Sequence, residues 1–147
     1  DGNNMANPLI VGGLKVGMNV AVATPDGYKP DGAVLEFTKG YGDKFALETD
    51  PFMAASGADI LITDTWTSMG EEAEKEERKK IFKDYQINRQ LLAAANAGAM
   101  IQHCLPAYRG QEITEEVFEE HADEIFNEAE NRLHAQKAVM VKLMKKD

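Results

Sequence analysis

The chain of 147 residues is 44% hydrophobic and 28% charged, a length and composition that suit one globular domain. Its 25 acidic and 16 basic side chains give a formal net charge of -9, which argues against binding to nucleic acid or to an anionic membrane surface. The single cysteine excludes an internal disulfide, and no apolar run reaches the length of about 18 residues that predicts a membrane span.

Apolar residues recur along the chain with spacings that predict helices alternating with short strands. Gly12 and Gly13 weaken the first expected helix but let it approach a sheet closely. The clearest strand is residues 59–64, where the continuous run Ile-Leu-Ile is typical of a strand covered on both faces. Asp50 followed by Pro51 indicates a helix start, because aspartate caps helices and proline suits their first turn. The expected helices are residues 5–16 and 31–39, one starting at Asp50, one ending near Lys83, residues 88–95, one starting at Thr114, and residues 128–145; the other expected strands are residues 19–23, 45–48, 99–103 and 125–126.

Strands that alternate with helices predict an α/β fold, a Rossmann-like parallel sheet flanked by helices on both faces. In such sheets ligands bind at the carboxyl ends of the strands. Three segments with unusual polar residues follow predicted strands, namely residues 64–70, 103–110 and 127–132. We therefore expect a functional site where these segments meet, within one domain that covers residues 1–147.

Residues 64–70 read Asp-Thr-Trp-Thr-Ser-Met-Gly and follow the clearest strand. Asp64 could hold the ammonium group of a substrate, while Ser68 and backbone amides could bind its carboxylate. An ordinary helix cap and turn explains the segment equally well. In the opening Asp-Gly-Asn-Asn segment, Asn3 or Asn4 is a plausible helix cap, and a cap and a ligand contact look the same in sequence.

The pair His103 and Cys104 ends another predicted strand and could serve a metal, a nucleophile or neither. One cysteine and three scattered histidines give no metal-ligand spacing, so no metal is expected. A thiol nucleophile would need a base and an oxyanion site, and neighbouring strand residues point to opposite faces. A structural cysteine is therefore the default interpretation.

Residues 128–132, Glu-Ala-Glu-Asn-Arg, are predicted to open the last helix. Acidic residues suit that position because they interact favourably with the helix dipole. Arg132 is unusual there and could form a fork for phosphate or carboxylate, with an ordinary surface arginine as the equally weighted alternative.

Taken together and in order, four segments resemble the ornithine carbamoyltransferase family: Asp-Gly-Asn-Asn, Asp-x-Trp-x-Ser-Met-Gly, His-Cys-Leu-Pro and Glu-Ala-Glu-Asn-Arg. The resemblance runs nearly end to end and includes residues 23–30. It implies an enzyme that transfers the carbamoyl group of carbamoyl phosphate to the δ-amine of L-ornithine, giving citrulline and phosphate. It also implies that residues 1–147 are the ornithine-binding domain, and that no metal or organic cofactor takes part.

The resemblance also implies roles for residues that match the family's motifs. Asn4 would contact the α-carboxylate and amine region of ornithine, and Asp64 would hold its α-amino group. His103 would contact the carbamoyl oxygen and Arg132 the carbamoyl phosphate, so that both could stabilise the oxyanion and the leaving group. The substrate-binding set is Asn4, Asp64, Ser68, Met69, Cys104, Leu105 and Arg132, and the catalytic set is His103, Cys104 and Arg132.

The sequence also departs from the family's pattern. Family members carry a preceding domain with a Ser-Thr-Arg-Thr phosphate loop and a His-Pro-x-Gln motif, and neither occurs here. The strand that leads into Asp-Gly-Asn-Asn would precede Asp1, so the fold's usual first strand is expected to be missing and the chain to be inactive alone.

The alternative functions are a non-catalytic, self-associating fragment, or a sister transcarbamoylase that uses another amine such as putrescine. The pair Ser68-Met69 favours ornithine, because in the family it accompanies recognition of α-amino acids. The expected partners are L-ornithine and carbamoyl phosphate, with a homo-oligomer, a trimer in the family, in the reducing cytoplasm.

Overall fold

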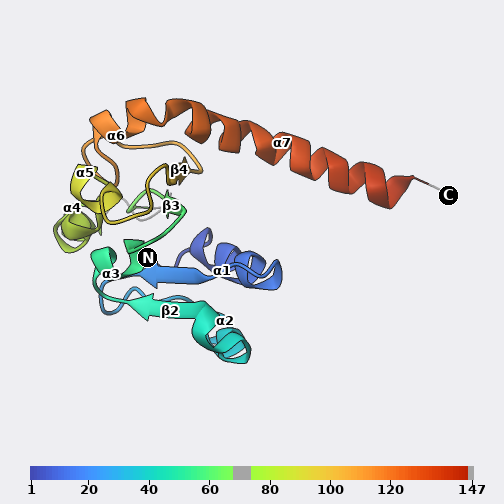
Figure 1. Ribbon diagram of the computed structural model, residues 1–147, viewed down its shortest axis with the longest axis horizontal. Coiled ribbons are helices and arrows are strands. Elements are labelled where there is room, and N and C mark those ends of the chain that lie inside the picture. Colours follow the sequence, from blue (N-terminus) through green and yellow to red (C-terminus); the bar gives the residue numbers. More distant parts are fainter. Residues whose placement is uncertain (68–73, 146–147) are drawn as a thin grey trace.

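The computed structural model describes residues 1–67 and 74–145, and short parallel strands alternate with helices along them (Figure 1). The strands are β1 (Val20–Ala23), β2 (Phe45–Glu48), β3 (Ile60–Thr63) and β4 (Met100–His103). The α-helices are α1 (Ala6–Lys15), α2 (Gly32–Thr38), α3 (Pro51–Ala55), α4 (Lys75–Phe82), α5 (Arg89–Leu92), α6 (Glu115–Glu120) and α7 (Ala122–Met144), and two 3₁₀ helices are η1 (Lys39–Lys44) and η3 (Lys83–Tyr85).

The four strands form two parallel pairs. In the first pair Val20 of β1 lies opposite Phe45 of β2, and in the second Ile60 of β3 lies opposite Met100 of β4. The N-terminus lies between the two pairs (Figure 1). Helix α3 contacts both strands of the first pair, and α7 contacts β4 of the second. The parallel α/β architecture predicted from the sequence is therefore confirmed.

The main hydrophobic core surrounds the pair β3–β4. Ile101 of β4, Ile113 before α6 and Ile125 in the first turn of α7 are fully buried. Burying an aliphatic side chain of this size stabilises the fold by about 1.5–3 kcal/mol. The carboxyl ends of β3 and β4 are thus held on a rigid, well-packed base.

A second packed region joins the N-terminal segment to the end of β3. Trp66 stacks on Phe82 with ring centroids 6.3 Å apart, and Tyr28 meets Phe82 edge-on at 4.9 Å. Arg78, only 5% exposed, donates a hydrogen bond to the Trp66 carbonyl and pairs with the Asp1 carboxylate. The N-terminal segment is therefore fixed beside the residues that follow β3.

Helix α7 differs from the prediction for the end of the chain. Residues 125–126 were expected to form a strand, but they belong to the first turns of this continuous helix, so that prediction is wrong. The Ile125 amide donates to the His121 carbonyl in the helical pattern, and Ile125 packs in the core. An apolar pair is too short to specify a strand against a helix. Residues 128–132 consequently lie inside the helix rather than at its start.

Within residues 1–67 and 74–145, none of the helices combines the length and the apolar character that crossing a bilayer would require.

Candidate functional site

Asp64 directly follows β3 and accepts hydrogen bonds from two segments far apart in the sequence. The side-chain amide of Asn3 donates to Asp64 Oδ2 at 3.0 Å, and the thiol of Cys104 donates to Asp64 Oδ1 at 3.1 Å. The backbone amide of Thr65 also donates to Oδ1, at 2.7 Å. The two parallel strands thus bring Asp64 and Cys104 together at one edge, where the sequence predicted a site.

From the N-terminal segment, Asn3 makes the contact with Asp64, whereas the contact of Asn4 with ornithine stays a prediction. Its side-chain oxygen accepts from the backbone amides of Met5 and Ala6, both at 2.9 Å, while its amide group reaches Asp64. Asn4 is exposed in the turn before α1. The Asn-Asn pair offered two candidates, and only the path of the turn distinguishes them.

Cys104 is half-buried, and its environment keeps the thiol protonated. Burial raises its pKa to about 12, together with the hydrogen bond to Asp64 and the charges of Asp64 and Glu128. A thiol with that pKa donates a hydrogen bond at neutral pH and does not act as a nucleophile.

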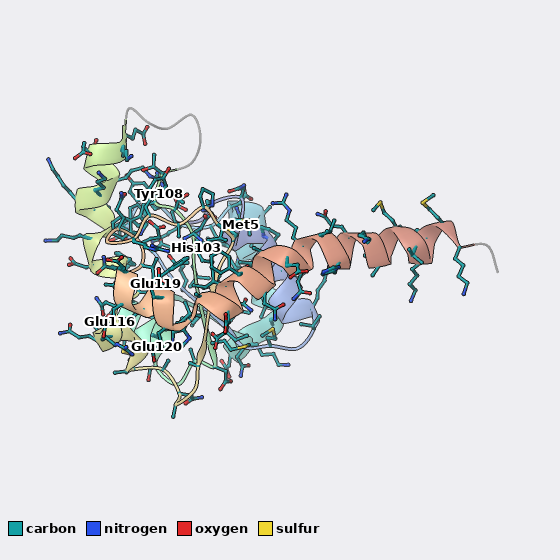
Figure 2. All side chains as sticks on the ribbon, turned by 90° about the horizontal axis from the view of Figure 1, so that it is seen from above. Met5, His103, Tyr108, Glu116, Glu119 and Glu120 are labelled. Carbon is teal, nitrogen blue, oxygen red and sulfur yellow. The ribbon has the colours of Figure 1, made fainter. Side chains whose placement is uncertain are left out.

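His103, the last residue of β4, is fully buried within the body of the molecule (Figure 2). Its Nδ1 accepts the backbone amide proton of Leu105 at 2.9 Å, and its Nε2 lies 3.1 Å from Glu112 Oε1. Because Nδ1 is an acceptor, the ring proton resides on Nε2 and is donated to Glu112. Both ring nitrogens are therefore engaged by the protein itself.

Glu128 of α7 adds a second carboxylate beside this network. Burial raises the pKa of Glu128, the charge of Asp64 adds to the increase, and a hydrogen bond from the His103 backbone opposes it. Its Oε2 is buried and has no hydrogen-bond partner among the described residues. The signal was present in the sequence, since Glu128 opens the Glu-Ala-Glu-Asn-Arg segment from which only Arg132 was selected.

The remaining predicted residues lie away from this network or cannot be placed. Arg132 is exposed on α7, one turn beyond Glu128, and among residues 1–67 and 74–145 no hydrogen bond or ion pair joins it to Asp64 or Cys104. Ser68 and Met69 lie outside the described residues.

Three possible metal-ligand atoms, one each from Asp64, His103 and Cys104, lie within 4.8 Å of one another. Each already has a hydrogen-bond partner in the protein, and Cys104 holds its proton. Asp64 and Cys104 are joined by a hydrogen bond, whereas His103 bonds to Glu112 and to the Leu105 amide. The Asp64 carboxylate and the neutral thiol suit a ligand that carries an ammonium group.

Comparisons with known proteins agree on one family. Residues 1–143 match the family described as "Aspartate/ornithine carbamoyltransferase, Asp/Orn binding domain". The chain is 55% identical to the ornithine carbamoyltransferase of Gloeobacter violaceus and 48% identical to that of Thermococcus kodakarensis, each alignment covering 98% of this chain and 47% of the relative. The chain therefore spans about half the length of the curated relatives it matches.

Solved structures give the same result. The anabolic ornithine carbamoyltransferase of Campylobacter jejuni superposes with a TM-score of 0.91 at 44% identity, over 97% of this chain and 48% of that chain. The ornithine carbamoyltransferase of Pyrococcus furiosus superposes with a TM-score of 0.84 at 46% identity, over 96% of this chain and 46% of that chain.

Proposed function

The chain belongs to the aspartate/ornithine carbamoyltransferase family, and from that premise we propose that it is the ornithine-binding domain of an ornithine carbamoyltransferase. The reaction transfers the carbamoyl group of carbamoyl phosphate to the δ-amine of L-ornithine. The amine nitrogen bonds to the carbonyl carbon, the bond from that carbon to the phosphate oxygen breaks, and citrulline and phosphate are formed.

The observation that carries this proposal is the network of Asn3, Asp64 and Cys104 at the ends of two adjacent parallel strands. Within the described residues, Asp64 accepts hydrogen bonds from the neutral donors Asn3, Thr65 and Cys104, so its negative charge can attract the α-ammonium group of ornithine. A charge-assisted hydrogen bond of this kind contributes about 1.5–3 kcal/mol. Glu128 adds a negative charge that favours the same cationic substrate.

The reacting amine needs a different environment from the α-amino group. A free alkyl ammonium has a pKa of about 10.4 and must lose a proton before it can attack. Cys104 and Leu105 are proposed to lie beside this amine and the carbamoyl group. Because Cys104 is a protonated thiol whose proton is donated to Asp64, it presents a neutral sulfur there and no competing nucleophile.

The roles of the other predicted residues follow from their positions. We propose that His103 supports the loop at Leu105 instead of touching the carbamoyl oxygen, since both its ring nitrogens are occupied. Arg132 is proposed to bind carbamoyl phosphate from the exposed face of α7, and Ser68 with Met69 to complete the grip on ornithine. We expect no citrulline formation from residues 1–147 alone, because carbamoyl phosphate would meet Arg132 with few other basic contacts.

The proposed partners of the full-length enzyme are its two substrates and further copies of itself, as a trimer by family resemblance. A cytoplasmic location is proposed on the same basis, and the function assigns no role to nucleic acid or to a membrane.

The test is the substitution Asp64→Asn in the full-length protein that contains this chain. Citrulline formation is measured while ornithine or carbamoyl phosphate is varied. We expect kcat/KM for ornithine to fall at least about tenfold, from the loss of a hydrogen bond to a charged group. Affinity for carbamoyl phosphate is expected to change little.

Asp26→Asn is the matched control, because Asp26 has 84% of its side chain exposed and pairs only with surface Lys29 in the described part of the chain. Unchanged ornithine kinetics in Asp64→Asn would refute the proposed role of Asp64. Turnover of putrescine in preference to ornithine by the wild-type protein would favour the sister transcarbamoylase instead.

A further inference from the structure

Glu112 is a buried carboxylate that the proposed function does not use. It lies between β4 and α6 and is fully buried. Its Oε1 accepts the Tyr108 backbone amide at 2.6 Å and lies 3.1 Å from His103 Nε2. A buried carboxylate is costly unless it is hydrogen-bonded, so these two donors determine where it can sit.

Glu112 fixes the orientation of the His103 ring. With the Nε2 proton directed at Glu112, Nδ1 is left as an acceptor and points at the Leu105 backbone amide, 2.9 Å away. If the ring turned over, ring carbons would take the places of both nitrogens, and neither hydrogen bond could form. The interaction therefore runs from Glu112 through His103 to the backbone of the His-Cys-Leu-Pro loop.

The loop needs such a restraint at Leu105. Its φ of 55° lies in the left-handed region, and Leu105 is the one non-glycine residue with positive φ in the part of the chain that the structure describes. A leucine adopts this conformation only when its surroundings hold it there. The neighbouring Cys104 depends on the same loop to place its thiol 3.1 Å from Asp64.

We propose that Glu112 is a positioning residue for carbamoyl transfer, which sets the His103 ring so that the backbone at Leu105 is held in place and the thiol of Cys104 meets Asp64. The inference rests on the proposed function, because the loop that Glu112 holds lies beside the reacting groups. It assigns Glu112 no contact with substrate.

Three substitutions in the full-length protein separate geometry from charge. Glu112→Gln removes the charge but keeps an acceptor oxygen at the same reach, whereas Glu112→Asp keeps the charge and withdraws it by one methylene. Glu112→Ala removes both. The control is Glu116→Ala on α6, an exposed residue paired with Arg89 on the surface (Figure 2).

We expect kcat to fall by about 10- to 100-fold in Glu112→Ala, the factor for losing a hydrogen bond to a charged group. Glu112→Asp is expected to lose at least about tenfold, and Glu112→Gln to stay within about threefold of wild type, since its oxygen still meets both donors. The KM for carbamoyl phosphate and the activity of Glu116→Ala should change little. If Glu112 served folding alone, the variants would have lower melting temperatures, but their kcat values would not fall in the order expected here, with Glu112→Gln close to wild type and Glu112→Asp and Glu112→Ala well below it.

Hydrogen exchange of the Leu105 amide gives a measure that is independent of turnover. We expect this exchange to be faster than in the wild type for Glu112→Asp and unchanged for Glu112→Gln. Wild-type kcat in Glu112→Asp, or a larger loss in Glu112→Gln than in Glu112→Asp, would overturn the inference even if Glu112→Ala fails to fold. If the wild-type protein forms no citrulline, the proposed function fails. In that case the exchange rate of the Leu105 amide alone tests whether Glu112 holds the loop. An exchange rate in Glu112→Asp equal to that of the wild type would overturn the positioning role of Glu112 as well.

Discussion

Cys104 has a reactivity that follows from its partners. The thiol is half-buried, donates to Asp64, and lies within the influence of the negative charges of Asp64 and Glu128. All of these disfavour a thiolate, and its pKa of about 12 lies above the ordinary value of 9.0. Because the shift is upward, the thiol remains protonated across the neutral range and ionises only as the pH approaches 12.

The prediction is slow alkylation of Cys104 by iodoacetamide. At pH 8 a thiol with this pKa is ionised in about one molecule in ten thousand, so the rate should rise about tenfold per pH unit up to pH 11 without a plateau. Asp64→Asn removes the negative charge and leaves only a neutral amide oxygen as acceptor, so it should lower the pKa of Cys104 and accelerate the reaction. Mass spectrometry of the Cys104 peptide measures the rate, and rapid alkylation at pH 8 in the folded wild-type chain would contradict this account.

Only part of the site could be predicted at the level of single residues. Asp64 and Cys104 were expected together because each follows a strand, and the ends of parallel strands meet. Glu112 was missed because nothing near it in sequence shows that it is buried. Its role depends on His103, nine residues away across a loop. Asn3 was not selected over Asn4 because the choice depends on how the turn is directed toward Asp64.

The contact between α1 and β1 depends on one of two adjacent glycines. A Cβ on Gly13 would lie 2.9 Å from Cγ2 of Val20, whereas a Cβ on Gly12 would meet no atom within 4 Å. Valine is stiff at χ1 and cannot easily move aside. The expectation that the glycines allow close approach to a sheet is thus met at Gly13 and not at Gly12.

Opposite effects on stability are therefore expected for the two alanine substitutions. Gly12→Ala should stabilise the chain by about 0.5–1 kcal/mol, because alanine loses less backbone entropy in a helix. Gly13→Ala should destabilise it by about 1–3 kcal/mol through overpacking against β1. Urea denaturation of the two variants measures the difference, and equal midpoints would show that the helix and strand are not in close contact.

The elements that the sequence located well are those with strong local signals. Asp50 and Thr114 cap α3 and α6 with their side chains, and the apolar run of β3 starts and ends within one residue of its prediction. The prediction failed at Ile125, where the local pattern cannot distinguish a short strand from a helical turn. At this position α7 packs on β4, and its helical hydrogen bonds continue without a break.

At the scale of the whole molecule, α7 projects from the body of the protein (Figure 1). It carries an apolar surface on which Leu143 and Met144 are 81% and 78% exposed. The other large exposed apolar residues of α7 are Phe126, Leu133, Val139, Met140 and Val141. Burying about 300 Å² of such surface at about 25 cal/mol per Å² gives roughly 7 kcal/mol before the cost of association.

A polypeptide of residues 1–147 is therefore expected to self-associate at micromolar concentration, which sedimentation equilibrium measures. Met140→Glu combined with Leu143→Glu should shift the population toward monomer, because charges oppose burial of this surface. Ala135→Glu combined with Gln136→Glu adds the same charge to α7 without removing large apolar side chains, and should leave association nearly unchanged. A single monomeric species in the unsubstituted polypeptide would contradict the prediction.

The packing around Trp66 has an optical consequence. It is the chain's single tryptophan, it is 8% exposed, and it lies two residues after Asp64 with its ring stacked on Phe82. Indole fluorescence responds to nearby charge and to the rigidity of its surroundings. A substrate ammonium bound to Asp64 would change both, so the emission of Trp66 is expected to report occupation of the proposed ornithine site.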